Sequence, residues 1–265
     1  THERSSAASD VYKRQPAFMS GRIADIAINP ENENEWYVAV GSGGVWKTTN
    51  SGTTWTPIAD NQSFYSTGCI TIDPHNTSRI WLGTGENVGG RHVGIGDGVY
   101  LSQNGGQTWK NMGLRKSEHI SKIIVSPDDQ NTVFVASQGP LWSPGGDRGL
   151  FKTTDGGQTW KNVLEINEWT GVTDLVIDHE NSNILYAATW QKHRNVAAHM
   201  GGGPGTSLYK SIDNGETWFK INTGLPNSNL GKIGLAISPF DSSILYAAVE
   251  LSLIHISEPT RRITI

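Results

Sequence analysis

Short apolar runs separated by polar turns recur along the chain in a fixed order. The first run of each unit has Ile, Leu or Val at its first and third positions and, in all but the fourth unit, Pro at its fifth, and a second apolar run follows it after a polar turn. The first runs occupy residues 26–30, 70–74, 123–127, 175–179 and 235–239, and the second runs residues 36–40, 80–82, 133–136, 185–188 and 245–248. Runs this short, without a 3.6-residue apolar period, predict β-strands.

A polar motif, Ser/Thr-x-Asp/Asn-x-Gly-x-Thr-Trp, follows four of these units. Its fixed positions are Thr48, Asn50, Gly52, Trp55; Ser102, Asn104, Gly106, Trp109; Thr153, Asp155, Gly157, Trp160; and Ser211, Asp213, Gly215, Trp218. Glycine can adopt positive φ, and an Asp or Asn oxygen can accept backbone N–H bonds within a turn. We therefore interpret the motif as a structural hairpin turn, with the Trp as an apolar cover, rather than as a source of catalytic carboxylates.

The motif tryptophans recur every 51 to 58 residues, which is the length of one propeller blade. Each blade then has four strands: the two apolar runs, the strand that enters the motif and the strand that leaves it. We predict an all-β partial β-propeller with blades at 22–58, 68–113, 120–164 and 172–222 and a half-blade at 232–250. Because about four and a half blades cannot close a ring, the sequence predicts a fragment of a propeller with about seven to ten blades, and the remaining blades are expected partners.

The two ends of the chain are related at the DNA level. Residues 10–15 can be encoded by DNA whose reverse complement encodes residues 251–256. The longer runs 5–15 and 251–261 resemble translated sequencing adapters. We therefore expect adapter-derived tails at 1–15 and 251–265, with the propeller segment at 16–250. The tails should pack poorly, except that the apolar segment 251–256 is expected to pair with the strand of Tyr246.

Charge and composition narrow the class of partner. The formal net charge is −4, and the predicted tails carry more basic than acidic residues, so the remaining segment is more acidic still. Without a basic run, no nucleic-acid partner is expected. One cysteine, Cys69, permits no internal disulfide, and no apolar run is long enough for a membrane span. We find no sequence motif for a metal or cofactor and expect neither.

The four turns resemble Asp-boxes, also called BNR repeats. The runs 40–49, 83–87, 96–100, 117–120 and 188–191 are more specific, and with them residues 16–250 resemble the large bacterial sortilin-like and xyloglucanase-related propeller proteins. The resemblance implies a many-bladed propeller. In the sortilin family this fold binds polypeptide ligands in its tunnel, which implies an extracellular or periplasmic location. The family's cysteine-rich module and membrane span have no counterpart in this sequence.

Long loops mark the expected ligand-binding face. In a blade, the second-to-third connections and the connections between blades share one face, opposite the Asp-boxes. Loops 84–97, 138–148 and 190–206 are far longer than closure requires, and such loops usually carry function. Together with the loops between blades they supply our ligand-binding candidates, which are Glu86, Asn87, Arg91, Glu118, His119, Trp142, Arg148, Trp169, Trp190 and Arg194.

Two functions remain open. Tryptophan and arginine side chains suit a peptide or a glycan, so the first is a noncatalytic, secreted or cell-surface binding or scaffold module. The second is a xyloglucanase-like glycoside hydrolase, which needs two carboxylates on either side of a sugar cleft and could draw them partly from outside this fragment. Eligible residues here are Glu86, Asp97, Glu118, Asp147 and Glu168. A blander alternative is that Glu86, Arg91 and Arg148 only form ion pairs that order the loops. The glycine run 201–205 is interpreted as a flexible loop.

Overall fold

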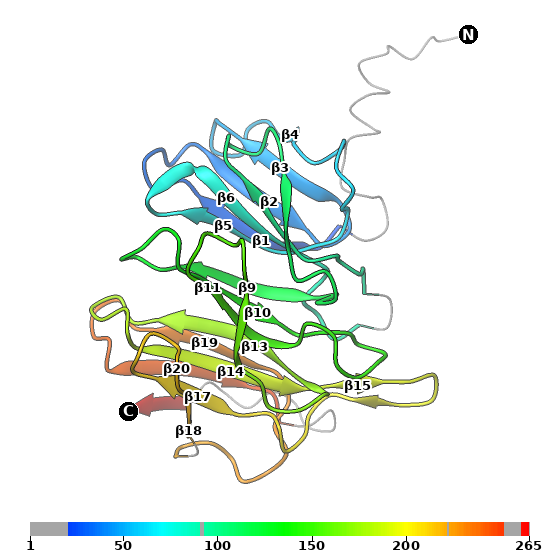
Figure 1. Ribbon diagram of the computed structural model, residues 1–265, viewed down its shortest axis with the longest axis vertical. Helices are drawn as coiled ribbons and strands as arrows, with labels where there is room; N and C mark the ends of the chain where they lie inside the picture. The colour runs from blue at the N-terminus through cyan, green and yellow to red at the C-terminus, as the bar shows by residue number, and fades with distance from the viewer. Residues whose placement is uncertain (1–20, 91–92, 222, 252–260, 265) are drawn as a thin grey trace.

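The structure is a computed structural model that describes residues 21–90, 93–221, 223–251 and 261–264. The described residues form strands and no helix. In Figure 1 the first two sheets lie at one end of the long axis, the third sheet lies in the middle, and the fourth and fifth sheets lie at the other end. The strands are β1(Ile23–Ile28), β2(Trp36–Val40), β3(Gly44–Thr48), β4(Thr56–Pro57); β5(Thr67–Asp73), β6(Asn76–Thr84), β7(Val99–Ser102), β8(Lys110–Gly113); β9(Ile120–Val125), β10(Val133–Ser137), β11(Gly149–Thr153), β12(Lys161–Leu164); β13(Thr170–Ile177), β14(Leu185–Gln191), β17(Leu208–Ser211), β18(Phe219–Ile221); and β19(Ile233–Ile237), β20(Ile244–Val249), β21(Arg261–Thr264).

Each sheet is an antiparallel meander whose strands pair in chain order. In the first sheet Ile23 faces Val40 and Val40 faces Gly44, while at the opposite end Ile28 faces Trp36 and Trp36 faces Thr48. The connections between blades and the second-to-third loops therefore share one end, which we call the rim. The box turns share the other end, which we call the box face.

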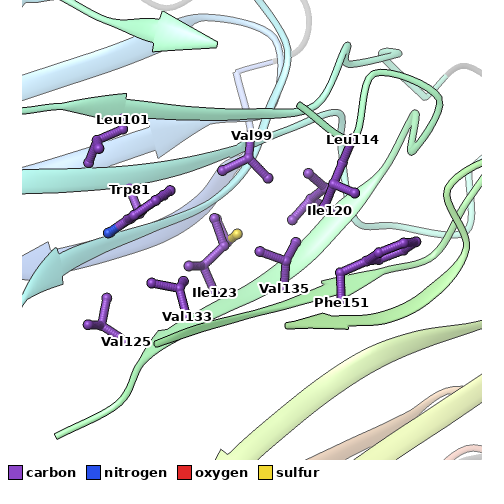
Figure 2. Close-up of a cluster of buried hydrophobic side chains, with 11 residues drawn as sticks. Trp81, Val99, Leu101, Leu114, Ile120, Ile123, Val125, Val133, Val135 and Phe151 are labelled. Atoms are coloured by element: carbon purple, nitrogen blue, oxygen red, sulfur yellow. The ribbon is translucent and has the colours of Figure 1, made fainter. Parts of the chain in front are cut away.

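Both faces of the central sheets are buried, because successive strand residues point to opposite sides. In β6, Ile80 and Leu82 pack toward the first sheet, whereas Trp81 packs toward the third. Figure 2 shows Trp81, Val99 and Leu101 facing Ile123, Val133 and Val135 across the junction of the second and third sheets. Equivalent clusters join the third sheet to the fourth and the fourth to the fifth. The chain is an all-β partial propeller, as the periodicity predicted.

The first strands of consecutive sheets are also tied by polar side chains. Asp25 Oδ2 accepts a hydrogen bond from the Ile70 N–H at 3.0 Å, and Asp174 Oδ2 accepts one from the Leu235 N–H at 2.8 Å. Between them, Thr71 Oγ1 donates to the Ile123 carbonyl at 2.8 Å. These links fix the inner register of the sheets, and the sequence pattern did not reveal them.

The fifth sheet is completed by a strand from the C-terminal segment. β21 pairs with β20, with Arg262 opposite Tyr246. The segment 252–256, which we expected beside Tyr246, lies outside the described residues, as do residues 1–15. Among the described residues, β20 thus pairs with β19 on one side and with Arg261–Thr264, within the stretch predicted to be a tail, on the other.

Candidate functional site

The four box turns are built alike. In each, the Ser or Thr hydroxyl donates to the Asp or Asn side chain and accepts the N–H of the motif glycine. In the third box these two distances are 2.7 and 3.0 Å. The motif glycines all have positive φ, between 79° and 90°. The side chains of the box are therefore occupied in holding the turn.

The second, third and fourth boxes also pack on the blade before them. A Cβ on Gly157 would lie 2.9 Å from Trp81, and one on Gly215 would lie 2.8 Å from Phe134. The box Trp160 meets Trp81 edge to face with ring centroids 6.4 Å apart. The boxes thus join neighbouring blades as well as closing their own hairpins.

Hydrogen bonds keep the box aspartates ionised. The Thr159 hydroxyl, followed by the Thr153 hydroxyl and the Thr159 N–H, lowers the pKa of Asp155 well below its usual range. The same arrangement, led by the Thr217 hydroxyl, lowers the pKa of Asp213 to about 2. A general acid at neutral pH needs a raised carboxyl pKa, so these groups suit turn formation rather than acid catalysis.

At the rim, Glu86 is buried and tied into the loop. Its Oε1 forms an ion pair with Arg22 at 2.8 Å, and its Oε2 accepts the Gly94 N–H at 2.8 Å. Only 3% of its surface is exposed. Glu86 therefore fastens loop 84–97 to the first blade. This agrees with the alternative that Glu86 only forms an ion pair that orders its loop, although its partner is Arg22 and not one of the ligand-binding candidates.

Arg148 fastens loop 138–148 through main-chain carbonyls and not through the ion pair that the alternative supposed. It is buried, and its guanidinium donates to the carbonyls of Gln138 at 2.6 Å and Trp169 at 3.3 Å, and to those of Pro140, Ser143 and Gly145. None of the described ion pairs includes Arg148. The expectation of a carboxylate partner is wrong for this residue, because main-chain carbonyls take its N–H groups.

A cationic cluster lies where the rim loops of four blades meet. Lys192 Nζ donates to Gln138 Oε1 at 2.5 Å, and Lys232 Nζ donates to the Asn87 carbonyl at 2.6 Å. Gln138 Nε2 also donates to the Asn87 carbonyl, at 3.3 Å. The two ammonium groups lie 5.1 and 5.9 Å from the ring centre of Trp190. Sequence reasoning missed both lysines, since nothing in their local sequence distinguishes them from surface lysines.

His119 borders this cluster and is held neutral. It is 1% exposed, and burial, with the charges of Lys192 and Arg148, lowers its pKa to about 3, while a hydrogen bond to the Glu86 backbone opposes the shift. Its Nδ1 has no hydrogen-bond partner among the described residues. His119 is therefore brought together with Glu86, Asn87, Arg148 and the lysines.

The tryptophan candidates occupy three different environments. Trp190 is buried, and its Nε1 donates to the Gly201 carbonyl at 2.8 Å, so its ring forms a wall and offers no free stacking face. Trp169 is half-buried and stacks on His193 with ring centroids 4.0 Å apart. Trp142 is 46% exposed. Of the three, Trp142 presents the open aromatic surface of the rim.

The two remaining ligand-binding candidates, Arg194 and Arg91, say little about how the rim would bind a ligand. Arg194 is half-buried in the small hairpin β15(His193–Arg194) and β16(His199–Met200), and its main-chain N–H donates to the Leu141 carbonyl at 3.1 Å. That bond anchors the hairpin beside Trp142. Arg91 lies outside the described residues.

Of the four remaining carboxylates eligible for catalysis, two accept hydrogen bonds from described residues and two do not. Asp97 accepts the Tyr100 hydroxyl at 2.8 Å, and Asp147 accepts the Lys116 N–H at 2.8 Å. Glu118 and Glu168 have no side-chain hydrogen bond among those of the described residues. Glu118 has a φ of 55°, is half-buried, and raises the pKa values of Arg148 and Lys192 by its charge. Of the five eligible carboxylates, it is the one whose charge acts on both Arg148 and Lys192.

The glycine run 201–205 is held more firmly than expected. Gly203 forms a bridge with Leu230, and the Gly205 N–H donates to Gln191 Oε1 at 2.8 Å. A Cβ on Gly202 would lie 2.5 Å from the Leu230 carbonyl oxygen. The interpretation of this run as a flexible loop is wrong, since its glycines allow close approach to the next blade.

The described residues contain neither a metal-ligand group nor a membrane-spanning helix. No group of three or more His, Cys, Asp or Glu side chains is placed there to hold a metal ion. None of the described segments is a helix long and apolar enough to cross a bilayer.

Known proteins with the same pattern fall into two groups. Residues 97–232 match the family model Sortilin-Vps10, described as "Sortilin, neurotensin receptor 3". The xyloglucanase of Hypocrea jecorina is 25% identical over 77% of this chain and 26% of its own length. The oligoxyloglucan-reducing end-specific xyloglucanase of Emericella nidulans is 22% identical over 79% and 25%, respectively. The chain thus spans about a quarter of the length of these relatives.

Solved structures show the same fold. The GH74 enzyme of Niastella koreensis superposes with a TM-score of 0.65 at 19% identity, covering 86% of this chain and 34% of that one. The GH74 xyloglucanase of Xanthomonas campestris gives a TM-score of 0.61 at 18% identity, over 87% and 35%. The resemblance predicted from the sequence, to sortilin-like and xyloglucanase-related propellers, is confirmed.

Proposed function

The chain belongs to the Sortilin-Vps10 family, and on that premise we propose that it is part of a glycoside hydrolase that acts on a xyloglucan-type glycan and binds the glycan at the rim. This replaces the noncatalytic module as the leading function, because the curated relatives that match three quarters of this chain are xyloglucanases. The observation that carries the proposal is the exposed Trp142, held at the rim by the buried Arg148, since exposed aromatic rings on an anchored loop suit stacking against sugars.

Within this segment, Glu118 is our candidate for a catalytic carboxylate. Glu86, Asp97 and Asp147 are occupied by loop contacts. Glu118 has no side-chain hydrogen bond or ion pair with a described residue, is half-buried at the rim and has a backbone conformation that is uncommon for a residue with a side chain. Its partner carboxylate would come from another blade, because a glycosidase needs the two groups on opposite sides of the sugar.

A polymeric glycan is met outside the cytoplasm, so the proposal also places the protein in the extracellular space or the periplasm. No cofactor enters the mechanism, because hydrolysis by two carboxylates needs only water. The further blades of a full ring remain proposed partners of this segment.

Binding tests the rim directly. Affinity for a xyloglucan oligosaccharide should fall about tenfold, or about 1.4 kcal/mol, in Trp142→Ala. Phe240→Ala is the matched control, because Phe240 is 95% exposed and lies in a first-to-second strand turn on the box face. Equal losses in the two variants would contradict binding at the rim.

Hydrolysis separates the two functions. Release of reducing ends from xyloglucan should be abolished in Glu118→Gln, with binding retained, and should persist in Glu165→Gln, an exposed residue outside the rim cluster. Binding without any hydrolysis by the wild-type protein would favour the noncatalytic module, whose ligand is a peptide or a glycan. The observation that supports that second function is the engagement of three of the five carboxylates in loop contacts.

A further inference from the structure

Two lysines at the rim have more hydrogen-bond donors than partners. Lys192 is 1% exposed, and the only hydrogen bond of its ammonium group among the described residues is to Gln138 Oε1. Lys232 is half-buried, and its ammonium donates to the Asn87 carbonyl. Neither lysine is in an ion pair with a described residue. An ammonium group has three N–H donors, so two donors on each lysine have no acceptor in the described structure.

Among the described residues, the carboxylates that act on these two lysines lie beyond ion-pair distance. Arg148 adds a third cation and gives all its contacts to carbonyls. Burial, followed by Arg148 and Lys232, lowers the pKa of Lys192 to about 7, and Glu118 opposes the shift. The pKa of Lys232 is lowered by burial and raised by Asp174 and Glu250. Buried charges are normally paired, whereas Glu118, Asp174 and Glu250 act on these lysines only from beyond ion-pair distance.

A third polar group nearby is also unpartnered. The Nδ1 atom of His119 is buried without a hydrogen bond among the described residues. Lys192 and Arg148 are the two charges that act on the His119 ring, which places the ring beside the same cluster. Because the neutral ring gives its one N–H to the Glu86 backbone, Nδ1 is left as a lone-pair acceptor, which can take a hydroxyl hydrogen of a bound ligand.

Rigid neighbours hold the two lysines in place. Both ammonium groups lie near the ring of Trp190, 5.1 and 5.9 Å from its centre, and the Trp190 indole N–H donates to the Gly201 carbonyl. Gln138 and the Asn87 carbonyl connect the second, third, fourth and fifth sheets through the two lysines. The donors are thus held in place before any ligand arrives, which reduces the cost of binding.

We propose that Lys192 and Lys232 bind the carboxylate of an acidic ligand at the rim. A carboxylate is the smallest negatively charged group on a sugar or organic acid that offers two acceptor oxygens, one for each ammonium. This rests on the proposed function in naming the preferred source, a uronic acid residue of a glycan. A free organic acid carries the same group, and the experiment separates the two sources.

Calorimetric titration at low ionic strength tests the proposal with sodium D-glucuronate, D-glucose and sodium acetate. Glucuronate should bind saturably, glucose should not bind under the same conditions, and acetate should bind at least tenfold more weakly than glucuronate. Lys192→Met and Lys232→Met should each weaken glucuronate binding at least tenfold. Lys210→Met is the matched control, because Lys210 lies over the Tyr186 ring, 5.2 Å from its centre, outside the rim.

Three results would overturn the proposal: glucose binding as well as glucuronate, acetate matching glucuronate, or unchanged glucuronate affinity in Lys192→Met. If the lysine variants do not fold, the wild-type protein still decides, through the NMR titration of the lysine Cε signals. Glucuronate should raise the pKa of Lys192, because an anion favours the ammonium form, and an unchanged titration contradicts the site. A neutral xyloglucan oligosaccharide that binds where glucuronate does not would reject the carboxylate site and leave the proposed function intact.

Discussion

At the scale of single residues, the box turns depend on a glycine that no other residue replaces well. Gly157 has a φ of 90°, and its α-carbon faces the Trp81 ring. In Gly157→Val, a β-branched residue would need positive φ and would also meet Trp81, so the free energy of unfolding should fall by about 1 to 3 kcal/mol. Urea denaturation measures it. Gly145→Val is the control for φ alone, because Gly145 has a φ of 70° with open space around it, and an equal loss there would rule out the packing contribution.

The box carboxylate is expected to be replaceable by an amide. Asn50 makes the same contacts as Asp155, with its Oδ1 accepting the Thr54 N–H at 2.9 Å and its Nδ2 donating to Thr54 Oγ1 at 2.9 Å. Asp155→Asn should therefore keep the thermal midpoint and glycan binding, whereas Asp155→Ala should lower the midpoint only. Loss of hydrolysis in Asp155→Asn at an unchanged midpoint would show that the structural interpretation of the box is wrong.

At the scale of strands and sheets, an aromatic residue in the second strand receives the box of the next blade. Trp81 is fully buried between the second and third sheets. Trp81→Ala should reduce the free energy of unfolding by about 3 to 5 kcal/mol, which is typical of large-to-small changes in a core. Phe240→Ala, in an exposed turn, should have little effect. Comparable losses in the two variants would contradict this account of sheet packing.

The strands could be predicted because each apolar run repeats with its turn, and turn chemistry acts locally. The ties between sheets could not. Asp25 and Asp174 accept N–H groups from the following sheet, so their role depends on partners 45 and 61 residues away. Likewise, Gly202 looks flexible in sequence, yet the approach of Leu230 is what requires a glycine there.

At the scale of the whole molecule, the rim should make stability depend on acidity. His119 is neutral in the native state, with its pKa lowered to about 3 chiefly by burial, whereas an unfolded histidine titrates near 6.5. Below about pH 6.5 the unfolded chain binds a proton that the native chain does not, so the free energy of unfolding falls by up to about 1.4 kcal/mol per pH unit until about pH 3. In His119→Gln this slope should be reduced, and in His179→Gln, an exposed control, it should remain. Identical slopes in the wild type and His119→Gln would contradict a neutral buried imidazole.

The sequence could predict where the candidate site lies, but not which partners its side chains have. Topology and loop length identified the end of the sheets where Glu86, His119 and Arg148 lie together. Their partners could not be predicted, because Arg148 is satisfied by carbonyls and Glu86 by Arg22, both set by loop conformation. Lys192 was missed because its burial results from the packing of four blades and not from any local pattern.

The central claim, that a glycan binds at the rim and not at the boxes, is tested most directly by NMR of the tryptophan indole N–H signals during titration with a xyloglucan oligosaccharide. The chain has 10 tryptophans, of which Trp142, Trp169 and Trp190 lie at the rim and Trp55, Trp109, Trp160 and Trp218 in the boxes, so both faces are sampled. We expect the signals of Trp142 and Trp169 to shift in proportion to saturation, while those of Trp55, Trp109, Trp160 and Trp218 stay unchanged. Shifts confined to the four box tryptophans would contradict the account.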